Sequence, residues 1–372
     1  MIARAKINPK MMEWARLHAG FTNGYEENLP GEIKKRYKKW ENGDIFPTWK
    51  QLRNASQKFN VPTAFFFMEK PPVIDELPEL INYRKLDLDS IYERKSPALI
   101  ECIRKSERRR SIFIDLYEEL NENVIGFEVP KIAQNKFNFS NYIREILNVS
   151  IETQKSWYNE KKHYSFLNNW KEVITQKLGI LIFETEGVDI NEMRGLCIFH
   201  NEIPIILLNG KDTPNGRIFT LFHELTHLLL GESAICGDDM DKDVEIFCNS
   251  VAGEFLVPEK DLLTNSNWSV KELANKYGVS YHVIYRRLLD TKNITHEEYD
   301  LKTEYDYEDY NDDSDGSSGY YLFNQIKYNG RPFYSLVLDA YDYGIISSIE
   351  FSKYTNLGQK QIPKLQQILF GR

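Results

Sequence analysis

The spacing of hydrophobic residues along the chain changes near residue 179. Before that point, apolar side chains recur every three or four residues, as they do on amphipathic helices. Residues 179–183, 195–199 and 203–209 are instead short and almost continuously apolar, which is typical of buried strands. Helical spacing returns a few residues later. The pattern therefore predicts an α+β protein that is mostly helical and contains one short sheet.

The helix predicted after the third strand is apolar on almost every side. Residues 219–230 read FTLFHELTHLLL, with a proline before them and a glycine after them that are typical of helix ends. His223 and His227 are four residues apart, so both imidazoles lie on one face. An ordinary core helix is the simplest alternative. However, two buried imidazoles and the carboxylate of Glu224 need strong partners, and a divalent metal ion would supply one.

A catalytic zinc site of this kind needs a third protein ligand and leaves the fourth place to water. Glu224, next to the first histidine, would lie near that water and is the candidate general base. Eight side chains downstream are candidates for the third ligand: Glu232, Asp238, Asp239, Asp241, Asp243, Glu245, Cys248 and Glu254. Their spacing alone does not choose between them.

The first 72 residues predict a small helical module. Asn8 and Pro9 fit an N-cap and a first helical position. Residues 40–67 contain W-E-N-G, P-T, V-P and F-F-F, an order that resembles the five-helix Xre-type helix-turn-helix domain of phage repressor-like proteins. In that resemblance, residues 32–39 are the recognition helix. Five basic side chains there are expected to contact DNA phosphates: Lys34, Lys35, Arg36, Lys38 and Lys39.

Part of this module departs from the Xre pattern. The second helix and its turn fall on residues 23–31, which carry a glycine near the start, a proline near the end, and Glu27 where a small residue is usual. The basic stretch also has few side chains of the kind that read bases. The alternative is a solvated lysine face on a module that binds only protein.

The segments around the strands have simpler patterns. Residues 70–95 are rich in proline and acidic residues and predict an extended linker. Residues 96–122 predict a long helix, and residues 129–178 predict further helices that act as a scaffold. Residues 302–318 are acidic and poor in aliphatic residues, which predicts a flexible linker. The remaining residues predict a compact three-helix tail.

Residues 268–288 contain a second helix-turn-helix pattern, with Gly278 in the turn. This element could bind DNA, but packing against the strands and the histidine helix is the interpretation that we favour. His282, Tyr285 and Arg286 on its second helix are candidates to stabilise an oxyanion. The sequence does not choose between these three.

Composition narrows the class of protein only a little. A hydrophobic content of 42% and a charged content of 27% are typical of a globular protein. The formal net charge of −8 argues against a chain that coats nucleic acid, but it permits a local basic patch. Four scattered cysteines make a disulfide framework unexpected. Without an apolar leader or a membrane-length run, we expect a cytoplasmic protein.

Residues 179–258 resemble the ImmA/IrrE family of metallopeptidases. Members pair F-T-x-x-H-E-x-x-H-x-L-L with a downstream E-x-x-x-N-x-x-A-x-x-L-L-x-P. The anchors present here are Phe219, Thr220, His223, Glu224, His227, Glu245, Asn249, Ala252, Phe255, Leu256 and Pro258. Val257 stands where methionine is common, and residues 83–86 resemble the F-R-x-L element of the family.

The resemblance implies a zincin-like, gluzincin-like endopeptidase with one Zn²⁺ per chain. His223, His227 and Glu245 would be its ligands, and Glu224 its general base. The substrate would be a regulatory protein, a repressor or antitoxin that is itself Xre-like. Its cleavage would relieve repression in a stress, mobile-element or phage response. We expect the strand that ends at Asn209 to bind this substrate as an added strand.

Two other functions stay open. The first is a toxin-like or transcriptional regulator that binds an antitoxin or DNA and has a latent peptidase site. The second is a zinc-stabilised scaffold, which would not need Glu224. In each case we expect five parts. They are an Xre-like module (1–72), a linker and helical scaffold (73–165), a zinc metallopeptidase domain (166–300), an acidic flexible linker (301–318) and a small helical C-terminal domain (319–372).

Overall fold

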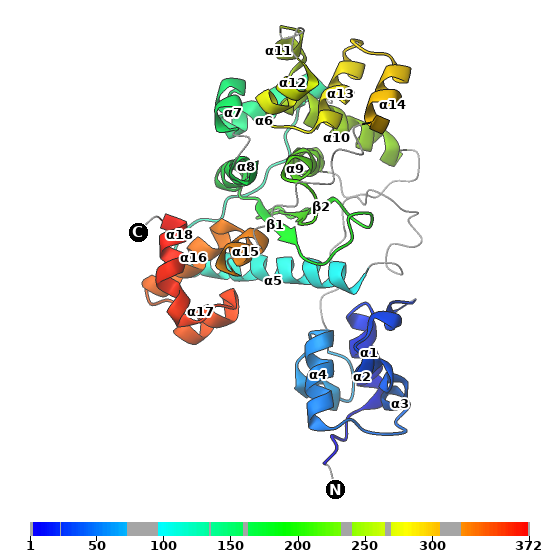
Figure 1. Ribbon diagram of the computed structural model, residues 1–372. Coiled ribbons are helices and arrows are strands. Elements are labelled where there is room, and N and C mark those ends of the chain that lie inside the picture. Colours follow the sequence, from blue (N-terminus) through cyan, green and yellow to red (C-terminus); the bar gives the residue numbers. More distant parts are fainter. Residues whose placement is uncertain are drawn as a thin grey trace. The chain divides into compact units, whose positions relative to one another are not determined.

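The computed structural model describes residues 3–22, 24–72, 96–133, 135–158, 163–231, 240–264, 269–305 and 321–370 (Figure 1). It divides into two compact units. The first comprises Met1–Pro78 and Lys85–Glu107, and the second comprises Glu79–Arg84 and Arg108–Arg372. Of the predicted linkers at 70–95 and 302–318, residues 73–95, with the F-R-x-L-like element, and residues 306–318 lie outside the described residues. Residues 302–305 were expected to be part of a flexible linker, but they form the end of a helix. Within the described ranges, every helix is too short or too polar to cross a membrane.

The first unit contains short helices around an apolar core that includes Trp40, Leu52 and Phe66. Its elements are α1 (Pro9–His18), η1 (Tyr25–Asn28), α2 (Gly31–Lys34), α3 (Tyr37–Glu41), α4 (Trp49–Phe59), η2 (Thr63–Phe67) and the first part of α5 (Pro97–Glu119). The Asn8 side chain accepts a hydrogen bond from the Lys10 N–H, and proline occupies the first helical turn. The predicted start of the first helix is therefore confirmed.

The predicted recognition helix, residues 32–39, is interrupted in the structure. Arg36, at φ −132°, separates α2 from α3. The segment expected to hold the second helix forms only the 3₁₀ turn η1, which lies between Gly24 at φ 98° and Pro30. Glycine tolerates this left-handed backbone, and proline lacks the N–H that a continuing helix needs. Up to residue 72, the described part of the unit thus differs from the five-helix expectation.

The second unit is built on a three-stranded sheet with the order β1-β3-β2. The strands are β1 (Leu181–Thr185), β2 (Gly195–Ile198) and β3 (Ile205–Asn209), close to the predicted runs. β3 is parallel to β1 and antiparallel to β2, so both of its edges are already paired. The expectation that the strand ending at Asn209 accepts a substrate strand is therefore wrong. Strand order follows from long-range pairing, which the apolar runs do not specify. β2 lies at the edge of the sheet.

One long helix lies against this sheet, and a second long helix packs on the first. α9 (Pro214–Leu230) contacts β2 and β3, and α10 (Met240–Leu256) packs on α9 (Figure 1). The Thr213 hydroxyl accepts a hydrogen bond from the Gly216 N–H at the start of α9, and Gly231, at φ 65°, ends the helix. These caps confirm the predicted limits of the histidine helix. The predicted scaffold helices are α6 (Lys136–Leu147), α7 (Ile151–Trp157) and α8 (His163–Leu178).

The second helix-turn-helix pattern is a structural part of the core. It forms α12 (Val270–Tyr277) and α13 (Tyr281–Asp290), between α11 (Glu259–Leu263) and α14 (His296–Tyr305). Leu273, Tyr277 and Ile284 belong to the same apolar cluster as the residues of α9 and α10. Arg287 is buried, pairs with Glu254 and donates to the Val257 carbonyl oxygen. The favoured interpretation of this pattern as core packing is confirmed.

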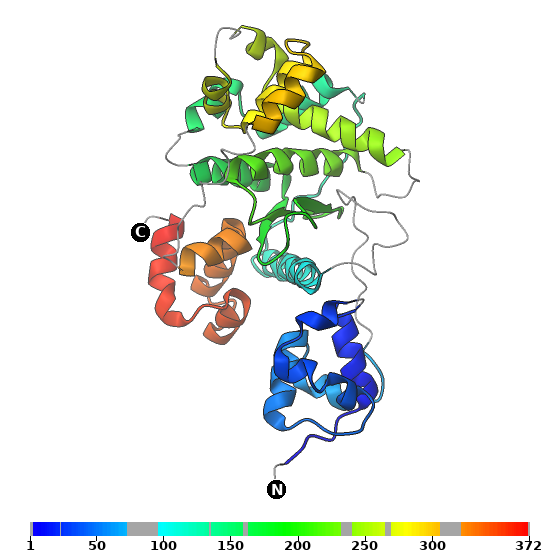
Figure 2. The ribbon, with the colours of Figure 1, turned by 45° about the vertical axis from the view of Figure 1, so that its right-hand side comes forward.

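The described part of the C-terminal segment, residues 321–370, contains four α-helices rather than the three predicted. They are α15 (Tyr321–Asn329), α16 (Arg331–Asp342), α17 (Ser348–Thr355) and α18 (Ile362–Phe370), drawn in orange and red (Figure 2). α15 packs against β1, the strand at the other edge of the sheet. Its buried residues are Leu322 and the polar Asn329, whose amide donates to the Tyr334 hydroxyl. Because one of these two buried residues is polar, the hydrophobic spacing of the sequence did not predict α15.

Candidate metal centre

Three of the predicted ligands come together between α9 and α10. The Nε2 atoms of His223 and His227 lie 3.1 Å apart. One oxygen of Glu245 lies 3.3 Å from the first of these nitrogens, and the other lies 3.2 Å from the second. Both imidazoles are almost completely buried. The structure thus holds two nitrogen donors and one carboxylate in a single cluster.

The spacing of these donors fits a zinc ion. Zinc bonds of roughly 2.0–2.1 Å in tetrahedral geometry place the ligand atoms about 3.3 Å apart. The contacts of 3.1, 3.2 and 3.3 Å in this cluster agree with that value. Two histidines and one glutamate are also a donor set of catalytic zinc sites, which keep the fourth place for water.

The charge state of Glu245 suits a ligand as well. Burial by itself raises the pKa of this carboxyl group, but hydrogen bonds and charge interactions with the protonated forms of His223 and His227 outweigh it. Together they hold the pKa of Glu245 well below its usual range. The side chain is therefore a carboxylate at neutral pH, as metal binding requires.

The other candidates for the third ligand are placed differently or not described. Glu254 pairs with the buried Arg287, whereas Cys248 and Asp243 are outside the three-residue cluster. Glu232, Asp238 and Asp239 lie outside the described residues, as does the side chain of Asp241. Of the described candidates, only Glu245 joins the two histidines.

Glu224 lies between α9 and the edge strand. It is 3% exposed, and a Cβ atom added to Gly195 would lie 3.0 Å from its Oε1 atom and 2.3 Å from Cγ2 of Thr220. Only glycine lets β2 pass this close to the helix. Cys197, two residues along the strand, hydrogen-bonds to Glu224, and its own burial followed by that carboxylate raises the pKa of the thiol well above its usual value. Cys197 is therefore a neutral S–H donor to Glu224.

Two further features were missed by sequence reasoning. Cys197 was noted only as a scattered cysteine, although strand alternation from Gly195 places it on the face toward α9. Asn249 was noted only as a motif anchor, yet its Oδ1 atom lies 3.1 Å from Nδ1 of His223. Its spacing of four residues from Glu245 on one helix was the available signal.

Comparison with known proteins identifies this region. The family model described as the IrrE N-terminal-like domain, Peptidase_M78, matches residues 175–289. We call residues 175–289 the ImmA/IrrE domain after this match. The radiation response metalloprotease IrrE of Deinococcus deserti is 34% identical over 91 aligned positions, and the match covers 20% of this chain and 32% of that protein. The chain thus matches about a third of the length of this relative. A solved transcriptional regulator of Mycobacterium tuberculosis matches with 13% identity and a TM-score of 0.27, over 41% of this chain and 50% of the regulator.

The candidate oxyanion residues lie on α13 of the ImmA/IrrE domain. Arg286 is exposed and pairs with Asp290 at 3.0 Å. The Lys302 ammonium lies 5.9 Å from the ring centre of Tyr285, and His282 is half-buried on the same helix. Arg286 thus contacts a residue of α13, and Tyr285 contacts a residue of α14.

The predicted DNA-contact residues lie in the first unit, outside the ImmA/IrrE domain. Lys35, Lys38 and Lys39 are exposed, and Arg36 is half-buried. Lys34 forms an ion pair with the exposed Glu27. The structure therefore presents a basic surface on α2 and α3, whether or not it binds DNA.

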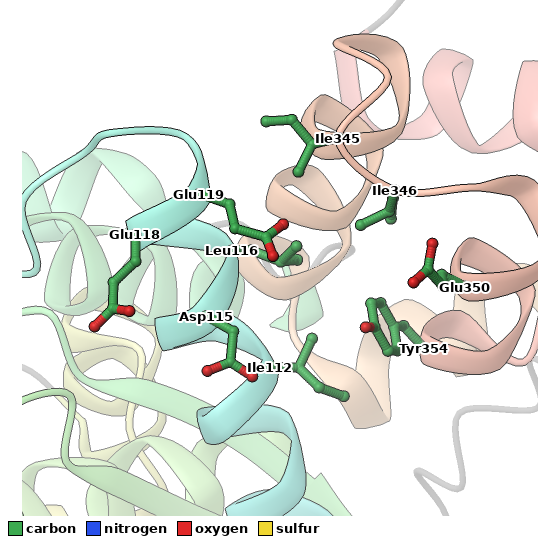
Figure 3. A pocket seen from close by; sticks show the side chains of 9 residues that line it. All are labelled: Ile112, Asp115, Leu116, Glu118, Glu119, Ile345, Ile346, Glu350 and Tyr354. Carbon is green, nitrogen blue, oxygen red and sulfur yellow. The ribbon is translucent and has the colours of Figure 1, made fainter.

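A cavity of about 240 Å³ lies apart from the metal cluster of the ImmA/IrrE domain. It is formed by the second half of α5 and by the region from the end of α16 to α17, and Figure 3 shows the carboxylates around it. Its lining residues are Ile112, Asp115, Leu116, Glu118, Glu119, Ile345, Ile346, Glu350 and Tyr354. None of them belongs to the candidate metal site. The cavity is acidic, and we assign it no catalytic part.

Proposed function

We propose that this protein is a zinc-dependent, gluzincin-type endopeptidase that cleaves a regulatory protein. The observation that carries the proposal is the cluster of His223, His227 and Glu245 at zinc-compatible spacing. One zinc ion per chain would be held there. The buried carboxylate of Glu224, on the same helix as the histidines, is the proposed general base.

The residues divide the reaction between them. A zinc ion held by the three ligands would lower the pKa of a water molecule at the open fourth position. Glu224 takes the proton of the attacking water and later passes it to the leaving amine. The thiol of Cys197 supports this carboxylate from the strand side.

The edge strand supports a site for the substrate backbone. The Asn209 N–H donates to the Arg194 carbonyl oxygen. The backbone polar groups of Arg194, the residue before β2, therefore point toward β3. Because hydrogen-bonding directions alternate along a strand, the N–H and C=O groups of Gly195 and Cys197 point away from β3, toward the open edge. We propose that the substrate adds there as a further strand, next to Glu224.

The proposed substrate is a repressor or antitoxin, itself Xre-like, whose cleavage relieves repression in a stress, mobile-element or phage response. The relative in Deinococcus deserti is described as a radiation response metalloprotease, which supports proteolysis in a stress response. A cytoplasmic location, an Xre-like character of the first unit and the five-part division of the chain belong to the same proposal.

The test uses the full chain, zinc and the protein encoded by the neighbouring gene. Cleavage detected by intact mass with wild type, and lost in Glu224→Gln, is the expected result. The glutamine keeps the size of the side chain but cannot act as a base. Tight binding without cleavage by either protein would favour a toxin-like or transcriptional regulator with a latent site. If zinc raises the melting temperature of the chain but the neighbouring protein is neither cleaved nor bound, the result would favour a zinc-stabilised scaffold.

The ligand assignment has its own test. Zinc content after dialysis is expected to be about one ion per chain for wild type, and Glu245→Ala is expected to lose most of it. Asp243→Ala, on the same helix but outside the cluster, is the matched control. Equal zinc binding by Glu245→Ala and wild type would remove Glu245 from the proposed ligand set.

A further inference from the structure

Helix α10 contacts one histidine of the site in two places. Glu245 lies 3.3 Å from Nε2 of His223, and Asn249 lies 3.1 Å from its Nδ1 atom. Residues four apart on a helix leave the same face, so α10 presents both side chains to one imidazole. The helix therefore supplies a proposed ligand and also holds another one.

The contact with Asn249 favours one tautomer of the imidazole. A neutral imidazole carries a single N–H, on either Nδ1 or Nε2. A nitrogen that binds a metal must offer its lone pair, so metal binding through Nε2 requires the proton on Nδ1. The amide oxygen of Asn249 accepts a hydrogen bond from Nδ1–H of His223 in that form. Asn249 thus stabilises the tautomer that is ready to bind metal.

His227 differs from His223 in this respect. Within the described residues, its Nδ1 atom is buried and has no hydrogen-bond partner. Its Nε2 atom lies 3.1 Å from Nε2 of His223, and two nitrogens at that distance share one proton. If His223 keeps its proton on Nδ1, His227 must be the donor in the metal-free protein. Only His227 then has to change tautomer when a metal binds.

We propose that Asn249 is a positioning residue that fixes His223 in the Nδ1–H tautomer. This ligand then presents the lone pair of Nε2 to the site before a metal ion binds. The inference rests on the proposed zinc site. Partners that hydrogen-bond to the second nitrogen of a metal-binding histidine typically contribute roughly ten- to a hundredfold to metal affinity. Asn249 contributes through His223 and does not itself bind the metal.

The first test is the zinc dissociation constant of the full chain, measured by competition with a chromophoric chelator. Asn249→Leu keeps the approximate size but removes the acceptor, and it is expected to weaken zinc binding by roughly 10- to 100-fold. Asn249→Asp keeps an acceptor oxygen and is expected to retain most of the affinity. Ser250→Ala is the matched control, because that hydroxyl donates only locally, to the Phe247 carbonyl oxygen. Asn249→Ala replaces the leucine variant if the latter does not fold.

The second test reads the tautomers directly in the metal-free protein. Two-bond ¹H–¹⁵N correlations are expected to show the proton of His223 on Nδ1 and that of His227 on Nε2. In Asn249→Leu, the preference at His223 is expected to disappear. A side chain that only stabilises the fold would not change this pattern.

The outcomes separate the two proposals. If Asn249→Leu binds zinc as tightly as wild type, or leaves the tautomer of His223 unchanged, Asn249 is not a positioning residue. If wild type itself does not bind zinc, the proposed function fails. The tautomer measurement on metal-free protein still decides the part of Asn249 in that case.

Discussion

The chain contains two helix-turn-helix patterns that the structure uses in different ways. In the first unit, residues 24–41 place Ile33, Tyr37 and Trp40 inward and leave lysines exposed on α2 and α3. In the second unit, α12 and α13 turn around Gly278 and join the core of the ImmA/IrrE domain. Similar local patterns thus give an exposed basic surface in one place and a structural support in the other.

The difference lies in what the second helix of each pattern contacts. α13 buries the cationic Arg287 against Glu254, at the end of the helix that carries Glu245. The helices α2 and α3 keep their lysines in solvent, where charge is available for a partner. A turn between two amphipathic helices therefore does not itself indicate nucleic-acid binding. The four predictions below test this contrast, from the largest expected effect to the smallest.

Removing Arg287 should have the largest effect on stability. Arg287→Ala leaves the carboxylate of Glu254 buried without its partner, which typically costs about 3–5 kcal/mol. Arg286→Ala is the matched control, because its side chain is 59% exposed and its ion pair with Asp290 should contribute less than about 1 kcal/mol. Urea unfolding of the full chain measures both. Similar midpoints for the two variants would show that α13 is not a structural support.

The two turns should respond differently to the same substitution. Gly278 has φ 71°, and a Cβ atom there would lie 2.3 Å from Cε1 of Phe166, so Gly278→Ala combines backbone strain with overpacking and should cost about 2–4 kcal/mol. Gly24 has φ 98° with open space around it, so Gly24→Ala should cost only about 1–2 kcal/mol. Thermal melting of both variants gives the comparison. An equal loss would mean that the second turn is not packed as the structure shows.

Local chemistry explains which parts of this fold were predictable. Pro214 and Gly231 marked the ends of α9, and the spacing of His223 and His227 placed both on one face. Contacts between distant segments were not predictable in the same way. The central position of β3 depends on pairing with β1 and β2, and the approach of Gly195 to Glu224 depends on how the sheet meets α9.

The basic surface of the first pattern should determine any binding to DNA. Neutralising Lys35 and Lys39 to glutamine removes two exposed charges, which should weaken binding to duplex DNA by about tenfold and lower its salt slope by about 2. Lys260→Gln with Lys271→Gln changes the net charge equally, on exposed positions near the second pattern. Fluorescence anisotropy over a salt series measures both. Equal losses in the two double variants would indicate a general charge effect and not a surface on α2 and α3.

Acid should affect the first pattern through His18. This histidine ends α1, where Arg104 of α5 contacts its ring nitrogen at 3.0 Å. Burial, followed by the charge of Arg104, lowers the pKa of His18 to about 4. The folded unit thus prefers neutral His18. The stability that this preference contributes is complete above the unfolded pKa of about 6.5 and is lost as the pH falls toward about 4.

Between pH 7 and pH 5, α1 should therefore become easier to open, by about 1–2 kcal/mol once solvent screening of the half-exposed ring is allowed for. Hydrogen exchange followed by mass spectrometry, corrected for the intrinsic pH dependence, measures this for α1 and α13 in one sample. His18→Gln cannot gain the proton, so its α1 protection should change little over this range. A loss of α1 protection that persists in His18→Gln would assign the acid sensitivity to another group. The Arg287–Glu254 pair that fixes α13 contains no histidine, although His282 lies half-buried on that helix, so α13 should lose less protection than α1.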